Sequence, residues 1–169
     1  MRTYLKIVDR HRATKWARLA NLFIDRIIFS LAFYLLGIVL VFFDNIFGIY
    51  FFTEYLLKIS EINRFTDIVF TTITFFCYTF FMEYLTKGRT LGKYITGTKV
   101  ITIDGENPTV KEYFIRSITR IVPFDGLSFL GENGWHDSWS DTRVINIKDY
   151  EAEKQAKSDI DDLGKKEIA

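Results

Sequence analysis

The pattern of apolar residues predicts two membrane-spanning helices. The first apolar stretch covers residues 19–43 and carries no charge after Arg26. A helix rises about 1.5 Å per residue, so this stretch can cross the ~30 Å hydrocarbon core of a bilayer. Its many large apolar side chains outweigh the cost of inserting Asp25, which is about 3 kcal/mol at mid-membrane. Residues 66–85 form a second, threonine-containing stretch of sufficient length, and we expect it to be the second span.

The segment between the spans is expected to lie on the membrane surface. Residues 46–53 are apolar but too short to cross, and Glu54 and Lys58 follow them. An interfacial loop or a short surface helix fits this pattern.

The chain after the second span predicts a small polar module. Residues 86–97 are rich in glycine and threonine, and residues 98–103 alternate before the Asp104–Gly105 turn signal, so we expect a compact strand and turn here. Residues 142–147 also alternate. Pairing the two segments into a β ribbon is the economical arrangement.

Residues 110–122 predict an amphipathic helix, with Arg116 and Arg120 opposite its apolar face. Each arginine adds about 2.5–3.5 kcal/mol to the cost of a spanning helix, and Pro123 interrupts the pattern. We therefore expect this helix at the cytoplasmic interface, with a third crossing by residues 113–131 as the open alternative.

The resulting fold class is a mainly α-helical membrane protein built on a two-helix transmembrane hairpin. Residues 1–147 are expected to form one membrane domain with an amphipathic helix and a two-stranded ribbon. Residues 148–169 are charged throughout and are expected to form a solvated, weakly helical cytoplasmic tail.

Composition supports a membrane protein and disfavours other classes. The chain is 49% hydrophobic with 17 Phe among 169 residues, more than one modest core needs. The 22 basic and 21 acidic residues nearly cancel, so no nucleic-acid footprint is present. Cys77 stands alone, and His11 and His136 lie far apart without cysteine partners, so neither a structural metal site nor a cofactor is expected.

The distribution of Lys and Arg predicts the orientation. Two basic residues lie between the spans, whereas six precede the first span: Arg2, Lys6, Arg10, Arg12, Lys15 and Arg18. Because basic residues concentrate on the cytoplasmic side, both termini are expected in the cytoplasm, with the protein in a bacterial cytoplasmic (inner) membrane.

Several short motifs in this order resemble the RDD family of small bacterial membrane proteins, over residues 16–147. They include Ala17-Arg18-Leu19, Ile24-Asp25, Gly88-x-Thr90-x-Gly92-Lys93 with Gly97 and Val100, the helix around Arg116, and His136-Asp137 followed by Thr142 and Val144. The resemblance assigns the family's arginine to Arg18 and its aspartates to Asp25 and Asp137. It implies transport, with ion exchange among the candidate activities. Residues 138–141 depart from the family pattern, which leaves the role of His136 and Asp137 open.

The candidate functional residues form one predicted polar cluster. Charges at one membrane depth cost several kcal/mol unless they are paired, so we expect them to meet on the cytoplasmic side. The members are Arg18, Asp25, Glu83, Arg116, Arg120 and Asp137. In this hypothesis Asp25 pairs with Arg116 or Arg120.

Two functions follow from this cluster. The first is transport of a small ion or solute, with Asp25 as the coupling carboxylate. Two helices cannot enclose a pathway, so transport requires a homo-oligomer. The alternative is a non-transporting binding or scaffolding module, in which the charges only dock the amphipathic helix onto the hairpin. No nucleophile, base and orienting acid are grouped, so enzymatic activity is not expected.

The predicted topology is tested by single-cysteine labelling in a Cys77→Ser background. A membrane-impermeant thiol reagent should label a cysteine placed at Ser60 but not one placed at Gly105 in intact cells, because the six-to-two division of basic residues places the loop outside. The opposite labelling pattern would invert the topology.

Overall fold

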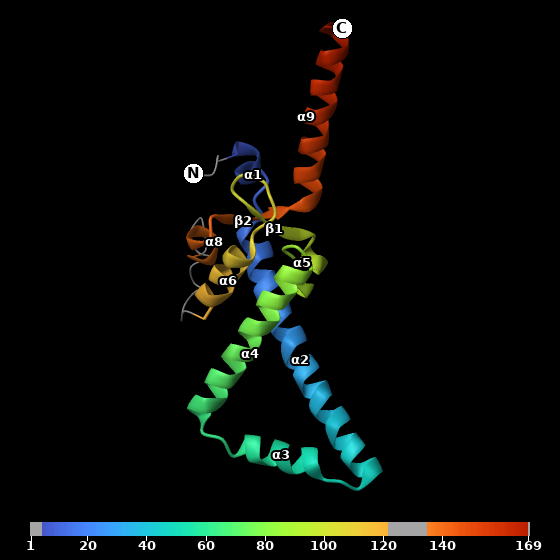
Figure 1. Cartoon of the computed structure of the whole chain (residues 1–169), viewed down its shortest axis with the longest axis vertical. Coiled ribbons are helices and arrows are strands. Elements are labelled where there is room, and N and C mark those ends of the chain that lie inside the picture. The colour runs from blue at the N-terminus through green and yellow to red at the C-terminus, as the bar shows by residue number, and fades with distance from the viewer. Residues whose placement is uncertain (1–4, 122–134, 169) are drawn as a thin grey trace.

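A computed structural model describes residues 5–121 and 135–168, with side chains in the last helix up to residue 160. The helices are α1 (Lys6–Arg10), α2 (Lys15–Phe47), α3 (Phe51–Ser60), α4 (Arg64–Leu85), α5 (Leu91–Thr96), α6 (Val110–Thr119), α8 (Trp135–Trp139) and α9 (Ile147–Ile168), and the strands are β1 (Thr98–Thr102) and β2 (Thr142–Asn146). We call α1, α5, α6, α8 and the two strands the head. It sits at one end of α2 and α4, and α3 bridges their far ends (Figure 1).

The helices α2 and α4 correspond to the two predicted spans. Both are long and apolar enough to cross a membrane. In each helix, only 11% of the apolar 18-residue stretch is buried inside the structure. A core helix of a soluble protein would be mostly buried, so these exposed apolar surfaces need an apolar environment outside the chain. This confirms the prediction of two candidate membrane-spanning helices.

The far end of the hairpin is fixed by one buried carboxylate. Asp44, 2% exposed, accepts a hydrogen bond from the Thr53 N–H at 2.5 Å. It thereby satisfies an otherwise free N–H in the first turn of α3. Helix α2 ends at Gly48, whose φ of +66° lets the chain turn into α3.

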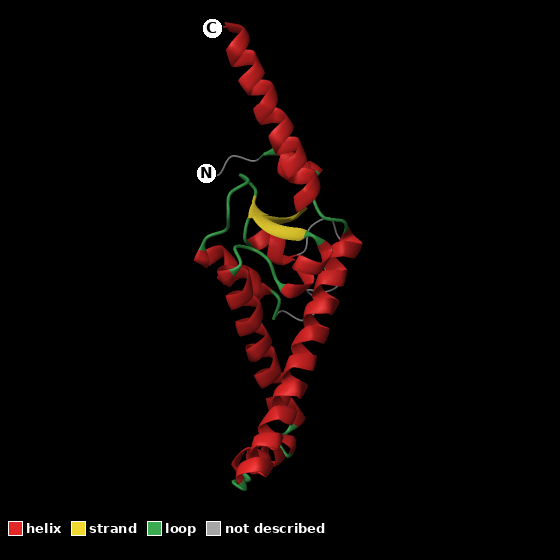
Figure 2. Cartoon of the chain, turned by 90° about the vertical axis from the view of Figure 1, so that its right-hand side faces the viewer, coloured by secondary structure: helices red, strands yellow, loops and turns green. Residues whose placement is uncertain are grey.

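The predicted ribbon is present over slightly shorter strands. β1 and β2 pair antiparallel, with Val100 opposite Val144. One face of the ribbon packs with Val8 of α1 and with Tyr150 of α9. The first turn of α9 therefore belongs to the core, so the predicted tail from residue 148 is not wholly separate from the domain. Beyond that turn α9 leaves the head as a long arm (Figure 2).

Four helices differ from the sequence-based expectations. Residues 86–97, expected as strand and turn, contain the short helix α5. Helices α1 and α8 were not expected, because five residues are too few to show a helical period. The helix predicted over residues 110–122 ends at Thr119, and the segment that decides on a third crossing lies largely outside the described residues.

Helix α5 lies against α2 because Gly92 has no side chain. A Cβ atom at Gly92 would lie 2.6 Å from the backbone oxygen of Asn21 and 3.2 Å from the carboxyl carbon of Asp25. The first distance is far below van der Waals contact, so any other residue forces the two helices apart.

We expect Gly92→Ala to lower the free energy of unfolding by about 1–3 kcal/mol, because the added methyl overpacks the contact between α5 and α2. Thermal unfolding in detergent measures the effect. Gly37→Ala is the matched control, since Gly37 lies in α2 with nothing within 4 Å of an added Cβ. Equal melting temperatures for the two variants would contradict the close contact.

Candidate functional site

A network of charged side chains lies where the head meets α2 and α4. Its central members are almost fully buried, although ionised groups are seldom buried unless they are paired. The exposed fractions are 3% for Arg18, 0% for Glu83, 2% for Lys93, 0% for Arg116 and 1% for Asp137. These buried residues come from distant parts of the sequence, from Arg18 to Asp137.

Glu83, in the last turn of α4, is the first centre of the network. Lys93 of α5 donates through Nζ to its Oε1 at 2.6 Å, and Arg120 donates through Nη2 to the same oxygen at 2.9 Å. Arg116 of α6 donates through Nε to Oε2 at 3.3 Å. Three cations thus hold one carboxylate and fasten α5 and α6 to the end of α4.

Asp137, in α8, is the second centre. Arg116 donates through Nη1 to its Oδ1 at 2.5 Å, and the same nitrogen bonds the hydroxyl of Thr142. Arg18 Nη1 lies 3.6 Å from Oδ2. Arg116 therefore bridges Glu83 and Asp137, while Arg18 ties α2 to the same aspartate.

The local environment lowers the pKa of two residues of the network, Lys93 and Asp137. Burial lowers the pKa of Lys93 to about 8, an effect that the Glu83 carboxylate only partly offsets. Burial opposes ionisation of Asp137, but the charges of His136 and Arg116 prevail and lower its pKa to about 2. Lys93 is therefore poised to release a proton near neutral pH, whereas Asp137 stays ionised.

Asp25 lies outside this network, which corrects the predicted pairing with Arg116 or Arg120. Its carboxylate accepts hydrogen bonds from the Thr90 hydroxyl at 2.5 Å, from the Gly92 N–H at 2.8 Å and from the Tyr78 hydroxyl at 3.3 Å. The physical reason is that the free N–H groups at the start of α5 attract a carboxylate as a cation does. Of the six predicted cluster residues, five meet and Asp25 does not join them.

Lys93, Thr90 and Gly92 were absent from the predicted site. They belong to the Gly88-x-Thr90-x-Gly92-Lys93 motif. The sequence therefore contained the motif but did not indicate which residues it contacts. The structure gives the reason for each position: Thr90 and Gly92 bind Asp25, and Lys93 binds Glu83. Gly88, at a φ of +101°, packs where a Cβ would lie 2.6 Å from the Val100 oxygen.

Within the parts of the chain that the structure describes, no group of three or more His, Cys, Asp or Glu side chains is placed to hold a metal ion. The interactions seen at the network are ion pairs and hydrogen bonds.

These features define the class: a membrane protein with two apolar helices and a charged, mostly helical head. A family model described as the RDD family matches residues 12–145. The chain belongs to the RDD family, a membrane-associated family, as the resemblance had indicated. No curated protein matches the chain, and no solved structure does.

A double-mutant cycle separates the two polar groups. Asp25→Ala combined with Thr90→Val should show a coupling of about 1–2 kcal/mol, because each change removes a partner of the same buried hydrogen bond. Asp25→Ala combined with Arg120→Ala should be additive within about 0.5 kcal/mol. Thermal unfolding in detergent measures both coupling energies. Strong coupling between Asp25 and Arg120 would support the ion pair predicted from the sequence.

Proposed function

We propose that the protein moves a small ion or solute across the bacterial cytoplasmic membrane as a homo-oligomer, with Lys93 releasing and taking up a proton beside the Glu83 carboxylate. The observation that carries the proposal is the buried ion pair between Lys93 Nζ and Glu83 Oε1, at 2.6 Å. Glu83 stands at the end of a predicted span. Ionisable groups at such positions are favoured as parts of ion and proton pathways.

The geometry lets Lys93 lose its proton without collapse of the network. Glu83 also has Arg116 and Arg120 as partners, so its carboxylate stays paired when Lys93 becomes neutral. With the pKa of Lys93 at about 8, a minor fraction of the lysine is neutral near pH 7 and the fraction grows as the pH rises. A small cation can then take the place of the lost proton beside Glu83.

This proposal moves the coupling role away from Asp25. Its three hydrogen bonds all come from neutral donors and hold the start of α5 in place. Asp25 therefore holds α5 against α2. The coupling role that the sequence suggested for Asp25 is assigned here to Lys93 beside Glu83.

An oligomer is needed because one hairpin does not enclose a pathway. Ring contacts join α2 and α4 through Phe29, Phe75 and Tyr78, and beyond these the helices separate towards α3 (Figure 1). Further copies would supply the missing walls. In this arrangement the head, α9 and both termini face the cytoplasm, since the basic residues lie at that end.

A binding or scaffolding module is the second candidate, and α9 favours it. This helix extends from the head without further support from the hairpin (Figure 2) and is fastened at its base through Glu153, which is 2.6 Å from His11 and 2.9 Å from Arg10. An isolated helix of this length is only marginally stable in water, so a partner along the arm would stabilise it.

The proposed function is tested by flux measurements in proteoliposomes with Lys93→Arg. Arginine keeps the positive charge beside Glu83 but does not deprotonate near neutral pH, so pH-dependent flux of ions should fall about tenfold or more. In the wild type, flux should change with a midpoint near pH 8, and this dependence should vanish in the variant.

Lys87→Arg is the matched control, because Lys87 precedes α5 and is exposed. It should leave flux and its pH profile unchanged. Wild-type vesicles without flux, together with capture of a partner that depends on α9, would favour the scaffolding module instead.

A further inference from the structure

Helix α6 carries polar residues on its buried side and apolar residues on its outer side. Its buried residues all have polar groups: Tyr113, Arg116, Ser117 and Thr119. Apart from Lys111 in the first turn, its exposed residues are apolar: Val110, Phe114, Ile118 and, just after the helix, Ile121. A surface helix of a protein in water shows the reverse pattern, with its apolar stripe facing the core. The outer side of α6 therefore fits an apolar environment.

Helix α5 has the same inverted pattern. Its buried residues are Gly92 and Lys93, which bind Asp25 and Glu83 through the N–H and Nζ groups. Its exposed residues are Leu91, Tyr94 and Ile95. Both helices lie beside the last turns of α4 (Figure 1). Each of them thus turns a charged residue inward and an apolar face outward.

The ribbon and α9 follow the opposite rule. Val100 and Val144 are buried at the centre of the ribbon, where they pack with Ala13. Along residues 151–160 of α9, the exposed side chains are mainly charged or polar. This is the packing of a protein surrounded by water. The head therefore combines a part that suits water with a part, α5 and α6, that suits lipid.

The contact between α6 and α4 indicates how deep α6 lies. The ring centroid of Phe114 is 5.7 Å from that of Phe76 and 6.1 Å from that of Phe80. Helix α4 has 22 residues and is about 33 Å long, so nearly all of it is needed to cross a hydrocarbon core of ~30 Å. Phe80 and Phe76 precede its last residue, Leu85, by about 8 and 14 Å. Phe114 is therefore at a depth that belongs to the bilayer.

We propose that the bilayer surface passes through the head, between the ribbon on one side and α5 and α6 on the other, and that lipid of the adjacent leaflet covers the outer faces of both helices. Helix α6 alone does not cross, because its ten residues are only about 15 Å long. From the sequence, only residues 110–122 were expected at the membrane, and only on its surface. The ion pairs of Glu83 then lie at the level of the membrane boundary.

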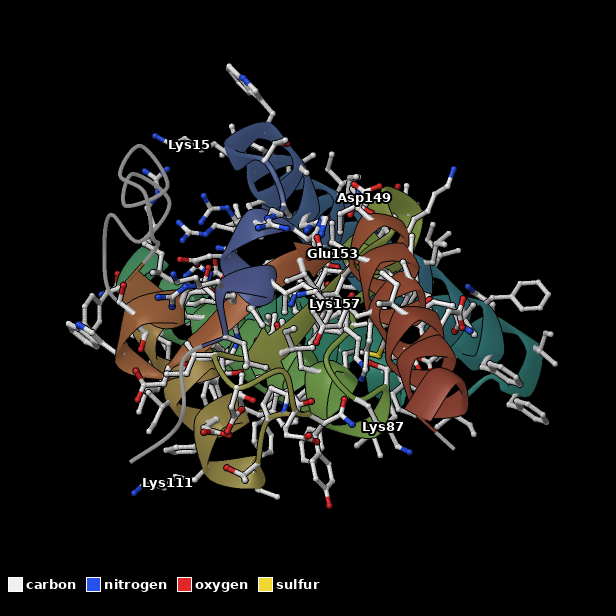
Figure 3. All side chains as sticks on the ribbon, turned by 90° about the horizontal axis from the view of Figure 1, so that it is seen from above. Lys15, Lys87, Lys111, Asp149, Glu153 and Lys157 are labelled. Atoms are coloured by element: carbon white, nitrogen blue, oxygen red, sulfur yellow. The ribbon has the colours of Figure 1, made fainter. Side chains whose placement is uncertain are left out.

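Basic residues beside the two apolar faces fit this position. Lys87 precedes α5 and Lys111 lies in the first turn of α6, and both project outward at the edge of the head (Figure 3). The Arg89 guanidinium lies over the Tyr94 ring, 5.3 Å from its centroid. Long basic side chains at a membrane surface place their stems against apolar groups and their charges near anionic headgroups.

The inference concerns the depth of the head, independently of transport, and spin labels test it. The variants Ile95→Cys and Ile118→Cys, in the Cys77→Ser background, are labelled with a nitroxide and placed in nanodiscs as the full chain. Power saturation compares collisions with oxygen, which concentrates in lipid, and with a water-soluble nickel chelate. Ile160→Cys in α9 is the matched control, since Ile160 is 66% exposed and Ile95 is 67% exposed. Oxygen should dominate at residues 95 and 118, and the nickel chelate at residue 160.

Aspartate substitutions give a second readout. A carboxylate is costly against lipid but not on a helix surrounded by water, so Ile95→Asp and Ile118→Asp should lower the melting temperature in nanodiscs by about 3–8 °C. Ile160→Asp should change it by less than about 2 °C.

Nickel accessibility at residues 95 and 118 equal to that at residue 160 would place both helices in water and overturn the inference. Labels that neither reagent reaches would show that protein, such as a second copy of the chain, covers these faces, which also rejects lipid contact. Lipid contact at only one helix would overturn the shared boundary. Equal losses of melting temperature in the three aspartate variants would contradict it as well, because the loss would then be independent of the environment.

Discussion

The structure depends on the position of Arg116 between two buried carboxylates. Its Nε reaches Glu83 at the end of α4, and its Nη1 reaches Asp137 in α8. Only arginine offers several donors in one rigid plane that can bind two carboxylates on different elements at once. Because all three side chains are almost unexposed, the removal of any one leaves the remaining buried charges with fewer partners. Such losses cost several kcal/mol, so the arrangement of the head on the hairpin is strongly specified.

A second, separate contact fixes the side of the head that faces α2. Asp25 binds the start of α5, and Gly92 allows the two backbones to approach. The result places Lys93, one residue later, against Glu83 on the other helix. Asp25 and Gly92 therefore position Lys93 without touching Glu83. This gives a physical purpose to the spacing of Thr90, Gly92 and Lys93 in the family motif.

The two buried carboxylates of the network have different sets of partners. Beside Glu83, burial lowers the pKa of Lys93 to about 8, and two arginines still hold the carboxylate when Lys93 loses its proton. Around Asp137, Arg116 and Arg18 approach the carboxylate, and the aspartate stays ionised. In the first arrangement a lysine with a lowered pKa lies beside a carboxylate that has two other partners, and in the second the carboxylate is held in its ionised form by arginines. Both lie where the hairpin meets the head.

The sequence by itself determined the two apolar helices, the ribbon and the helix of Arg116, since each has a local period or a long apolar run. It also showed that the charged residues near Asp25 and Glu83 need partners. It did not determine which partners these residues have, because the free N–H groups at the start of an α-helix and an arginine side chain can both bind a carboxylate. Only the tertiary structure decided that Asp25 binds α5 and that Glu83 binds Lys93, Arg116 and Arg120. That choice depends on the close approach of backbones at Gly92, a distance between chain segments that local sequence does not encode.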